Sequence, residues 1–139
     1  MSGTAGALLG IEDPIGIDLP LGLFDELCET TPWLVDLKPA GAHLMEDFYY
    51  AGGLPAVLEQ IRDLLHLDAL TVTGRTVGEN LDAAATEIID EGVIRPRTNP
   101  LDAGGSLVVL RGNLCPDGAV MKISAADPRL LAHEGRAIV

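Results

Sequence analysis

The spacing of apolar residues predicts two amphipathic helices in the first half of the chain. Residues 18–32, "DLPLGLFDELCETTP", and residues 54–67, "LPAVLEQIRDLLHL", repeat apolar positions at helical intervals. Pro20 suits the start of the first helix and Pro32 its end. Because free cysteines are often buried, Cys28 on this stripe is predicted to be a core residue rather than a ligand. The two stripes comprise Leu21, Phe24, Leu27 and Cys28, and Leu54, Val57, Leu58, Ile61, Leu64 and Leu65.

Shorter patterns predict further helical turns around the second stripe. Residues 44–53, "LMEDFYYAGG", predict one or two turns that end at Gly52 or Gly53, the usual position of a C-terminal glycine. Residues 70–81, "LTVTGRTVGENL", predict a short extended segment, a glycine turn and a short helix. In that helix Thr76 and Glu79 match the S/T-x-x-E capping box.

The pattern changes to strand periodicity near the end of the chain. Residues 106–112, 119–124 and 135–139 read as strands, "SLVVLRG", "AVMKIS" and "GRAIV". The first two flank "NLCPDG", in which Pro116 fits position i+1 and Gly118 position i+3 of a type I turn. Proline and glycine are dense in residues 92–105, which predicts a linker. The pattern therefore predicts a helical front, a linker and a β back.

Composition and charge add to this picture. The chain has 139 residues, 47% of them hydrophobic, with a mean hydropathy of +0.28, which predicts apolar surface covered by something else. The net charge of −12 comes from 21 acidic and 9 basic residues, and sparse basic residues argue against nucleic acid and anionic membranes as partners. No apolar run approaches the roughly 18 residues of a membrane span. Two distant cysteines make a disulfide improbable, so a cytoplasmic location is expected.

Candidate chemical groups each have a plainer interpretation. Cys115 lies near Arg111 and could be a nucleophile, but its place before a turn favours a structural thiol. Lys122 could be a base, but a lysine in a strand pattern usually faces solvent. The three histidines, at 43, 66 and 133, share no ligand spacing with any thiol or carboxylate. Phosphate-loop, dinucleotide and nucleophile-elbow motifs are missing from the sequence. No catalytic, cofactor-binding or metal-binding residue is assigned.

Four long motifs carry a family resemblance. In chain order they are "FDELCETTPWLVDL", "LKPAGAHLMEDFYYAGGLPAVLEQI", "LTVTGRTVGENL" and "GNLCPDGAVMKISAADPRLLAHEGRAIV". From Gly16 to Val139 the chain resembles the interior of the dihydroxy-acid and sugar-acid dehydratases, and "MEDFYYAGG" and "GNLCPDGAV" are most similar to the branch acting on arabinonate, xylonate or gluconate. The resemblance implies an iron–sulfur and Mg²⁺ dependent lyase. Such an enzyme, a homo-oligomer, converts a small 2,3-dihydroxy acid to a 2-keto acid, either a sugar acid or a precursor of branched-chain amino acids.

The resemblance also implies what this chain does not carry. The family's cluster cysteines and first Mg²⁺ ligands would lie upstream of this segment, and a further carboxylate and the serine base downstream. Cys28 and Cys115 lie outside the cluster motifs. The expected fold is mixed α/β: residues 1–91 as the helical tail of the large N-terminal dehydratase domain, 92–105 as linker, and 106–139 as the first strands of a swivel-like β-barrel domain.

Three functional hypotheses follow. The first is a dehydratase fragment that is inactive alone and binds neither the cluster nor Mg²⁺. The second is a non-catalytic interaction module that self-associates or complements a partner chain through exposed apolar surface. The third is a small independent enzyme that uses Cys115.

Overall fold

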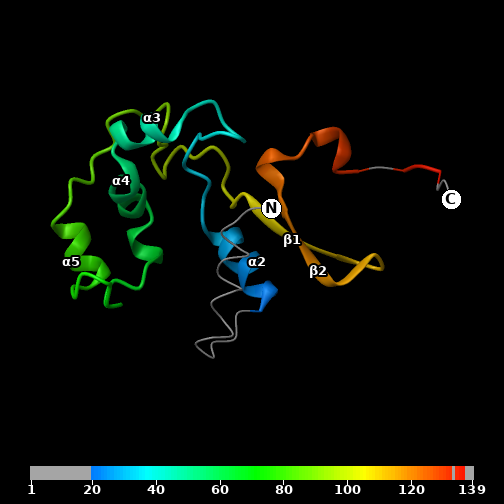
Figure 1. Ribbon diagram of the computed structural model, residues 1–139, viewed down its shortest axis with the longest axis horizontal. Coiled ribbons are helices and arrows are strands. Elements are labelled where there is room, and N and C mark those ends of the chain that lie inside the picture. Colours follow the sequence, from blue (N-terminus) through cyan, green and yellow to red (C-terminus); the bar gives the residue numbers. More distant parts are fainter. Residues whose placement is uncertain (1–19, 133, 137–139) are drawn as a thin grey trace. The chain divides into compact units, whose positions relative to one another are not determined.

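The computed structural model describes residues 20–132 and 134–136, which form two compact units (Figure 1). Among the described residues, one unit combines 20–28 with 106–132 and 134–136, and the other comprises Glu29–Gly105. The elements are α2 (Leu21–Thr30), α3 (Met45–Tyr50), α4 (Gly53–Gln60), α5 (Val77–Asp82), β1 (Leu107–Gly112) and β2 (Cys115–Lys122), with 3-10 turns η1 (Arg62–Leu64), η2 (Ile123–Ala125) and η3 (Pro128–Leu130). This mixture of helices with a two-stranded sheet is the mixed α/β class expected, whereas the assignment of these parts to dehydratase domains stays a prediction.

The buried cluster of the Glu29–Gly105 unit joins residues far apart in the chain. Ala51 and Ala56 from the α3–α4 region pack with Val93 and Ile94, and the Ile94 side chain is fully buried. The backbone supports this contact, because an extended segment at 33–37 pairs with residues 93–102 through bridges at Trp33–Asp102 and Val35–Ile94. The first part of the segment predicted as a linker is therefore packed into this unit.

The short elements of this unit follow their local signals. α3 ends at Tyr50, just before the two glycines, and both Gly52 and Gly53 adopt positive φ, at 121° and 62°. Thr76 and Glu79 form two reciprocal hydrogen bonds at the N-terminus of α5. The Thr76 hydroxyl accepts from the Glu79 N–H at 3.2 Å, and the Thr76 N–H donates to the Glu79 carboxylate at 2.8 Å. The predicted capping box is confirmed.

α4 differs from its prediction in length and in the face that it buries. The helix ends at Gln60, and residues 62–64 continue as the 3-10 turn η1. The residue that is completely buried is Ala56, which lies outside the predicted stripe, whereas Leu54 on the stripe is 59% exposed. The apolar stripe therefore marks the buried face only in part: Val57 on the stripe packs against the buried cluster, but Ala56 beside it is the residue that is completely buried.

In the other unit β1 and β2 form an antiparallel hairpin, as the strand patterns predicted. The tight turn lies at residues 113–114, because Gly112 pairs with Cys115. The predicted Cys-Pro-Asp-Gly turn is therefore wrong: these residues belong to β2, where the register shifts opposite the segment between Leu110 and Gly112. Gly118 has a φ of 102°, typical of the glycine in a bulge.

α2 spans Leu21–Thr30 between its two prolines, as predicted. Its Asp25 carboxylate accepts the Val109 N–H at 2.8 Å and pairs with the Arg111 guanidinium at 3.3 Å, which attaches the helix to β1. Residues 135–136 are not in a strand, and the rest of the third predicted strand lies outside the described residues. Within the described part of the chain, no helix combines the length and apolar character needed to cross a bilayer.

Candidate functional site

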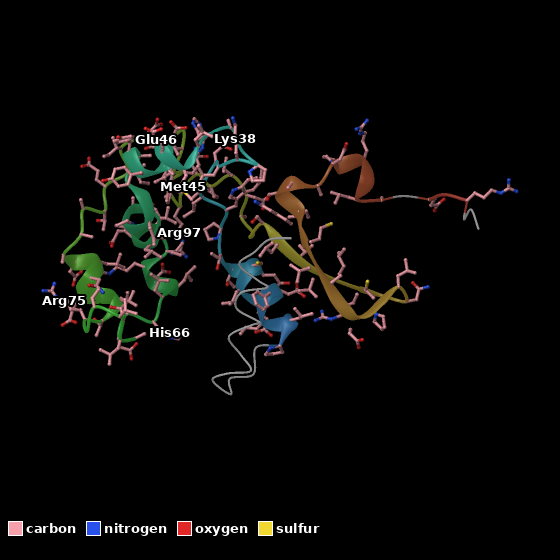
Figure 2. The ribbon with its side chains drawn as sticks, viewed as in Figure 1. Lys38, Met45, Glu46, His66, Arg75 and Arg97 are labelled. Carbon is pink, nitrogen blue, oxygen red and sulfur yellow. The ribbon has the colours of Figure 1, made fainter. Side chains whose placement is uncertain are left out.

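A mostly apolar groove lies on the Glu29–Gly105 unit, and we name it the α3 groove. It has a volume of about 740 Å³. Several lining side chains are strongly exposed, including Tyr49 at 75%, Ile89 at 74% and Met45 at 69%. Figure 2 shows Met45 and Glu46 at the same end of the unit as Lys38, away from His66 and Arg75. The lining residues are Met45, Phe48, Tyr49, Tyr50, Gly52, Gly53, Leu54, Pro55, Ala85, Glu87 and Ile89.

Gly52 allows the two sides of the α3 groove to approach each other. A Cβ placed on Gly52 would lie 2.5 Å from the Glu87 carbonyl oxygen and 2.8 Å from the Ala56 Cβ. The Ile89 N–H donates to the Ala51 carbonyl at 2.9 Å, which holds the segment after α5 against the α3–α4 junction. Gly52 therefore follows the end of α3 and also accepts a close backbone contact, which no sequence pattern indicated.

A second hollow of about 350 Å³, with a mixed polar and apolar lining, adjoins the α3 groove and shares Tyr50 and Ile89 with it. We name it the polar hollow. His43, Asp47 and Asp90 contribute an imidazole and two carboxylates. The side chains of the two aspartates already accept backbone hydrogen bonds: Asp47 from the Leu44 N–H and Asp90 from the Gly92 N–H, each at 2.7 Å.

His43 completes the polar side of this surface. Its Nε2 lies 3.7 Å from an Asp36 carboxylate oxygen, close enough for an ion pair when the imidazole is protonated. The polar hollow thus places two carboxylates and an imidazole beside the apolar α3 groove. The combined surface can therefore bind an apolar group next to a cationic or hydrogen-bond-donating one.

A smaller apolar pocket extends this surface along α4. It measures about 240 Å³, lies between α4 and α5, and shares Leu54 and Pro55 with the α3 groove. Leu81 of α5 is nearly buried beneath it. Apolar surface therefore continues from α3 along one side of α4.

Three of the residues singled out in the sequence, Arg111, Cys115 and Lys122, lie on the β1–β2 hairpin. Cys115 is exposed directly after the hairpin turn, so its predicted packing role is wrong. Arg111 pairs with Asp25, a partner that lies in α2 and that no local pattern indicated. Lys122 is half-buried at the end of β2, opposite Leu107, rather than fully solvated.

Of the remaining candidates, Cys28 is half-buried in α2 and His66 is exposed. His133 lies outside the described residues.

Ion pairs shift the pKa of a few surface groups. The hydrogen bond from the Arg97 guanidinium lowers the pKa of Asp63 below its ordinary value, and a hydrogen bond from Arg129 does the same for Asp127. Hydrogen bonds to Asp82 and Glu59 raise the pKa of Arg62. Each shift has a surface partner of opposite charge as its main cause, which is typical of structural ion pairs.

The donor set of this chain does not fit a complete iron–sulfur ligand set. Such clusters are held mainly by several cysteine thiolates, and the chain has two cysteines, one half-buried in α2 and one exposed beside the hairpin turn. Across residues 20–132 and 134–136 the structure shows no group of three or more histidine, cysteine or acidic side chains placed to hold a metal ion.

Comparison with known proteins identifies the family. The N-terminal domain model of the dihydroxy-acid/6-phosphogluconate dehydratases matches residues 5–80, and the C-terminal domain model matches residues 92–139. The chain belongs to this dehydratase family. The family match confirms the resemblance found in the four motifs, and residues 81–91, which contribute Glu87 and Ile89 to the α3 groove, lie between the two matched regions.

Similar relatives include proteins named as L-arabinonate or L-arabonate dehydratases and proteins named as dihydroxy-acid dehydratases. The L-arabinonate dehydratase of Rhizobium leguminosarum bv. trifolii is 49% identical over 95% of this chain and 23% of its own length. The dihydroxy-acid dehydratase of Caldicellulosiruptor saccharolyticus is 44% identical over the whole chain and 26% of its own length. The L-arabonate dehydratase of Azospirillum brasilense is 49% identical over 95% of the chain and 23% of its own length. The chain spans about a quarter of the length of these relatives.

Proposed function

We propose that this chain works as part of a dehydratase that converts a 2,3-dihydroxy acid to a 2-keto acid. The observation that carries the proposal is that both domain models of the family match one chain in the family order. In the reaction the C2–H and C3–O bonds break, the proton and the hydroxyl leave as water, and the resulting enol tautomerises to the ketone. The chain's own described residues supply structure and binding surface to this enzyme.

The proposed substrate class is a sugar acid such as arabinonate, xylonate or gluconate. Relatives named as arabinonate or arabonate dehydratases, at 49% identity, support it. Relatives named as dihydroxy-acid dehydratases, at 44% to 48%, keep the dihydroxy acids of branched-chain amino-acid synthesis as the alternative. Competition between the two acids in one assay would decide between them.

We place the iron–sulfur and Mg²⁺ ligands of the complete enzyme in other parts of the polypeptide. Two cysteines are too few for the cluster, and those of this chain lie in two different elements. Isolated, the chain is expected to be inactive. A cytoplasmic homo-oligomer is the proposed state of the complete enzyme.

A segment exchange tests the proposal. The segment of the Rhizobium leguminosarum enzyme that aligns with this chain is replaced by the chain, and 2-keto acid formation is measured with arabinonate, xylonate, gluconate and 2,3-dihydroxyisovalerate. The chimera is expected to dehydrate at least one of them. A folded chimera that contains its cluster and turns over none of these acids would contradict the proposal.

The chain alone is the matched comparison. After anaerobic incubation with iron, sulfide and Mg²⁺, it is assayed with the same four acids. No product is expected, and turnover by the isolated chain would refute its proposed role as an incomplete part.

A further inference from the structure

We propose that the α3 groove is a docking surface for an apolar polypeptide segment that carries lysine or arginine, contributed by a part of a family-length dehydratase outside this chain. The inference rests on the proposed function in one respect, namely that the partner belongs to a dehydratase. It adds which surface of this chain makes the contact and what chemistry the contacting segment has.

The apolar side chains of the α3 groove are the first argument. Five of them are more than half exposed although they are large: Met45, Tyr49, Tyr50, Leu54 and Ile89. Contiguous exposed apolar surface of this kind marks interaction sites in soluble proteins. Tyrosine in particular is enriched in the centres of interfaces because its rigid ring buries a large area at small entropic cost.

The carboxylates around the groove indicate the charge of the docking segment. Glu87 lines the groove, and Asp47 and Asp90 line the polar hollow that shares Tyr50 and Ile89 with it. An occupant with lysine or arginine beside its apolar residues would complement these carboxylates. A second copy of the chain would bring another net charge of −12 to the contact, and an anionic membrane would also be repelled.

The greater length of the relatives indicates where the docking segment comes from. The relatives that match this chain extend over about four times its length, since the chain covers 23% to 26% of them. The groove is built from a junction inside the N-terminal match and a segment between the two matches. Its large apolar side chains are exposed, so a part of the enzyme outside this chain can contact them. A covering segment from that part would remove the exposed apolar side chains from water.

The first test compares the same substitutions in two settings. Tyr49→Ser and Ile89→Ser alter the groove, and Val72→Ser is the matched control because Val72 is fully exposed and lies outside the groove. In the isolated chain all three are expected to leave the thermal unfolding midpoint nearly unchanged. In the chimera with the Rhizobium leguminosarum enzyme, the two groove variants are expected to lower the midpoint by several degrees and the control to leave it in place. Equal shifts for groove and control variants in the chimera would overturn the proposal.

The second test identifies the chemistry of the partner. Overlapping peptides covering the Rhizobium leguminosarum enzyme are probed with the full labelled chain. Peptides from outside the aligned segment that combine apolar residues with lysine or arginine are expected to bind, about tenfold more weakly to Tyr49→Ser or Ile89→Ser and equally to Val72→Ser. Glu87→Gln is expected to weaken binding at low salt and to have a smaller effect at high salt.

Three results would overturn the proposal in this second test. The first is peptide binding that is unchanged by the groove substitutions. The second is preferential binding of acidic peptides. The third is a dimer of the chain, detected by light scattering, that is lost in Tyr49→Ser. Because neither test reads catalysis, an inactive chimera that shows the expected groove effects would refute the proposed function alone. An active chimera without those effects would refute the docking surface alone.

Discussion

Replacing Gly52 by alanine tests whether a close backbone approach holds the α3 groove together. Gly52 has a φ of 121°, a backbone conformation that side chains with a Cβ rarely adopt. The added methyl group would lie 2.5 Å from the Glu87 carbonyl oxygen and 2.8 Å from the Cβ of Ala56, which is fully buried. Neither neighbour is the free end of a flexible side chain, so the backbone itself must move.

The expected loss of stability has two parts. The left-handed conformation costs a residue with a Cβ about 1–2 kcal/mol, and forcing an extra methyl group into a packed site typically costs about 1–3 kcal/mol. Gly52→Ala should therefore lower the free energy of unfolding by about 2–5 kcal/mol. For a small domain this is a large fraction of the total.

Urea denaturation followed by circular dichroism measures this loss. With a slope of about 2 kcal/mol per M urea, the midpoint should fall by about 1–2.5 M. Gly74→Ala is the matched control, because Gly74 has a φ of 77° and a Cβ there would meet nothing within 4 Å. The control should show only the conformational part, about 1–2 kcal/mol. If Gly52→Ala costs no more than Gly74→Ala, the packing argument is refuted.

Three further predictions concern caps, ion pairs and thiols. Thr76→Ala should destabilise α5 by about 1 kcal/mol, whereas Thr76→Ser should retain the cap. Amide exchange in α5 measures the difference, and an equal loss of protection in both variants would contradict the capping hydrogen bonds. Because Arg97 lowers the Asp63 pKa below its ordinary 3.8, the ion pair stabilises the fold above that value and is lost as pH falls through the folded-state pKa. Arg97→Gln should therefore raise the Asp63 pKa in an NMR titration, and an unchanged pKa would exclude the pair. In the folded chain Cys115, which is exposed, should react with a thiol reagent faster than half-buried Cys28, and the fast phase should vanish in Cys115→Ser.

Several features of the fold could be predicted from neighbouring residues alone. Pro20 and Pro32 bracket α2, and the glycine pair follows the end of α3. The Thr76 cap depends on a residue three positions away, so four letters of sequence contain the whole interaction. The four family motifs are local strings of the same kind, and both domain models confirm them.

The candidate site could be predicted only in outline. The high mean hydropathy indicated apolar surface that another molecule or segment would bury, which agrees with the exposed side chains of the α3 groove. The groove's position could not be predicted, because it depends on a contact between distant residues. The segment after α5, with Glu87 and Ile89, packs against the α3–α4 junction at Gly52. A glycine pair looks the same in a sequence whether it ends a helix or also receives another backbone.

Contacts between distant parts of the chain account for the predictions that failed or needed correction. The Pro-Asp-Gly residues favour a turn locally, but pairing of Gly112 with Cys115 places the hairpin turn before them and leaves a bulge at Gly118. Proline and glycine made residues 92–105 resemble a linker, yet Ile94 is fully buried because extended segments pair across the unit. Helix caps and stops thus follow from near neighbours along the chain. Buried faces, turn registers and grooves depend on which distant segments pack together in the lowest free-energy state of the whole chain.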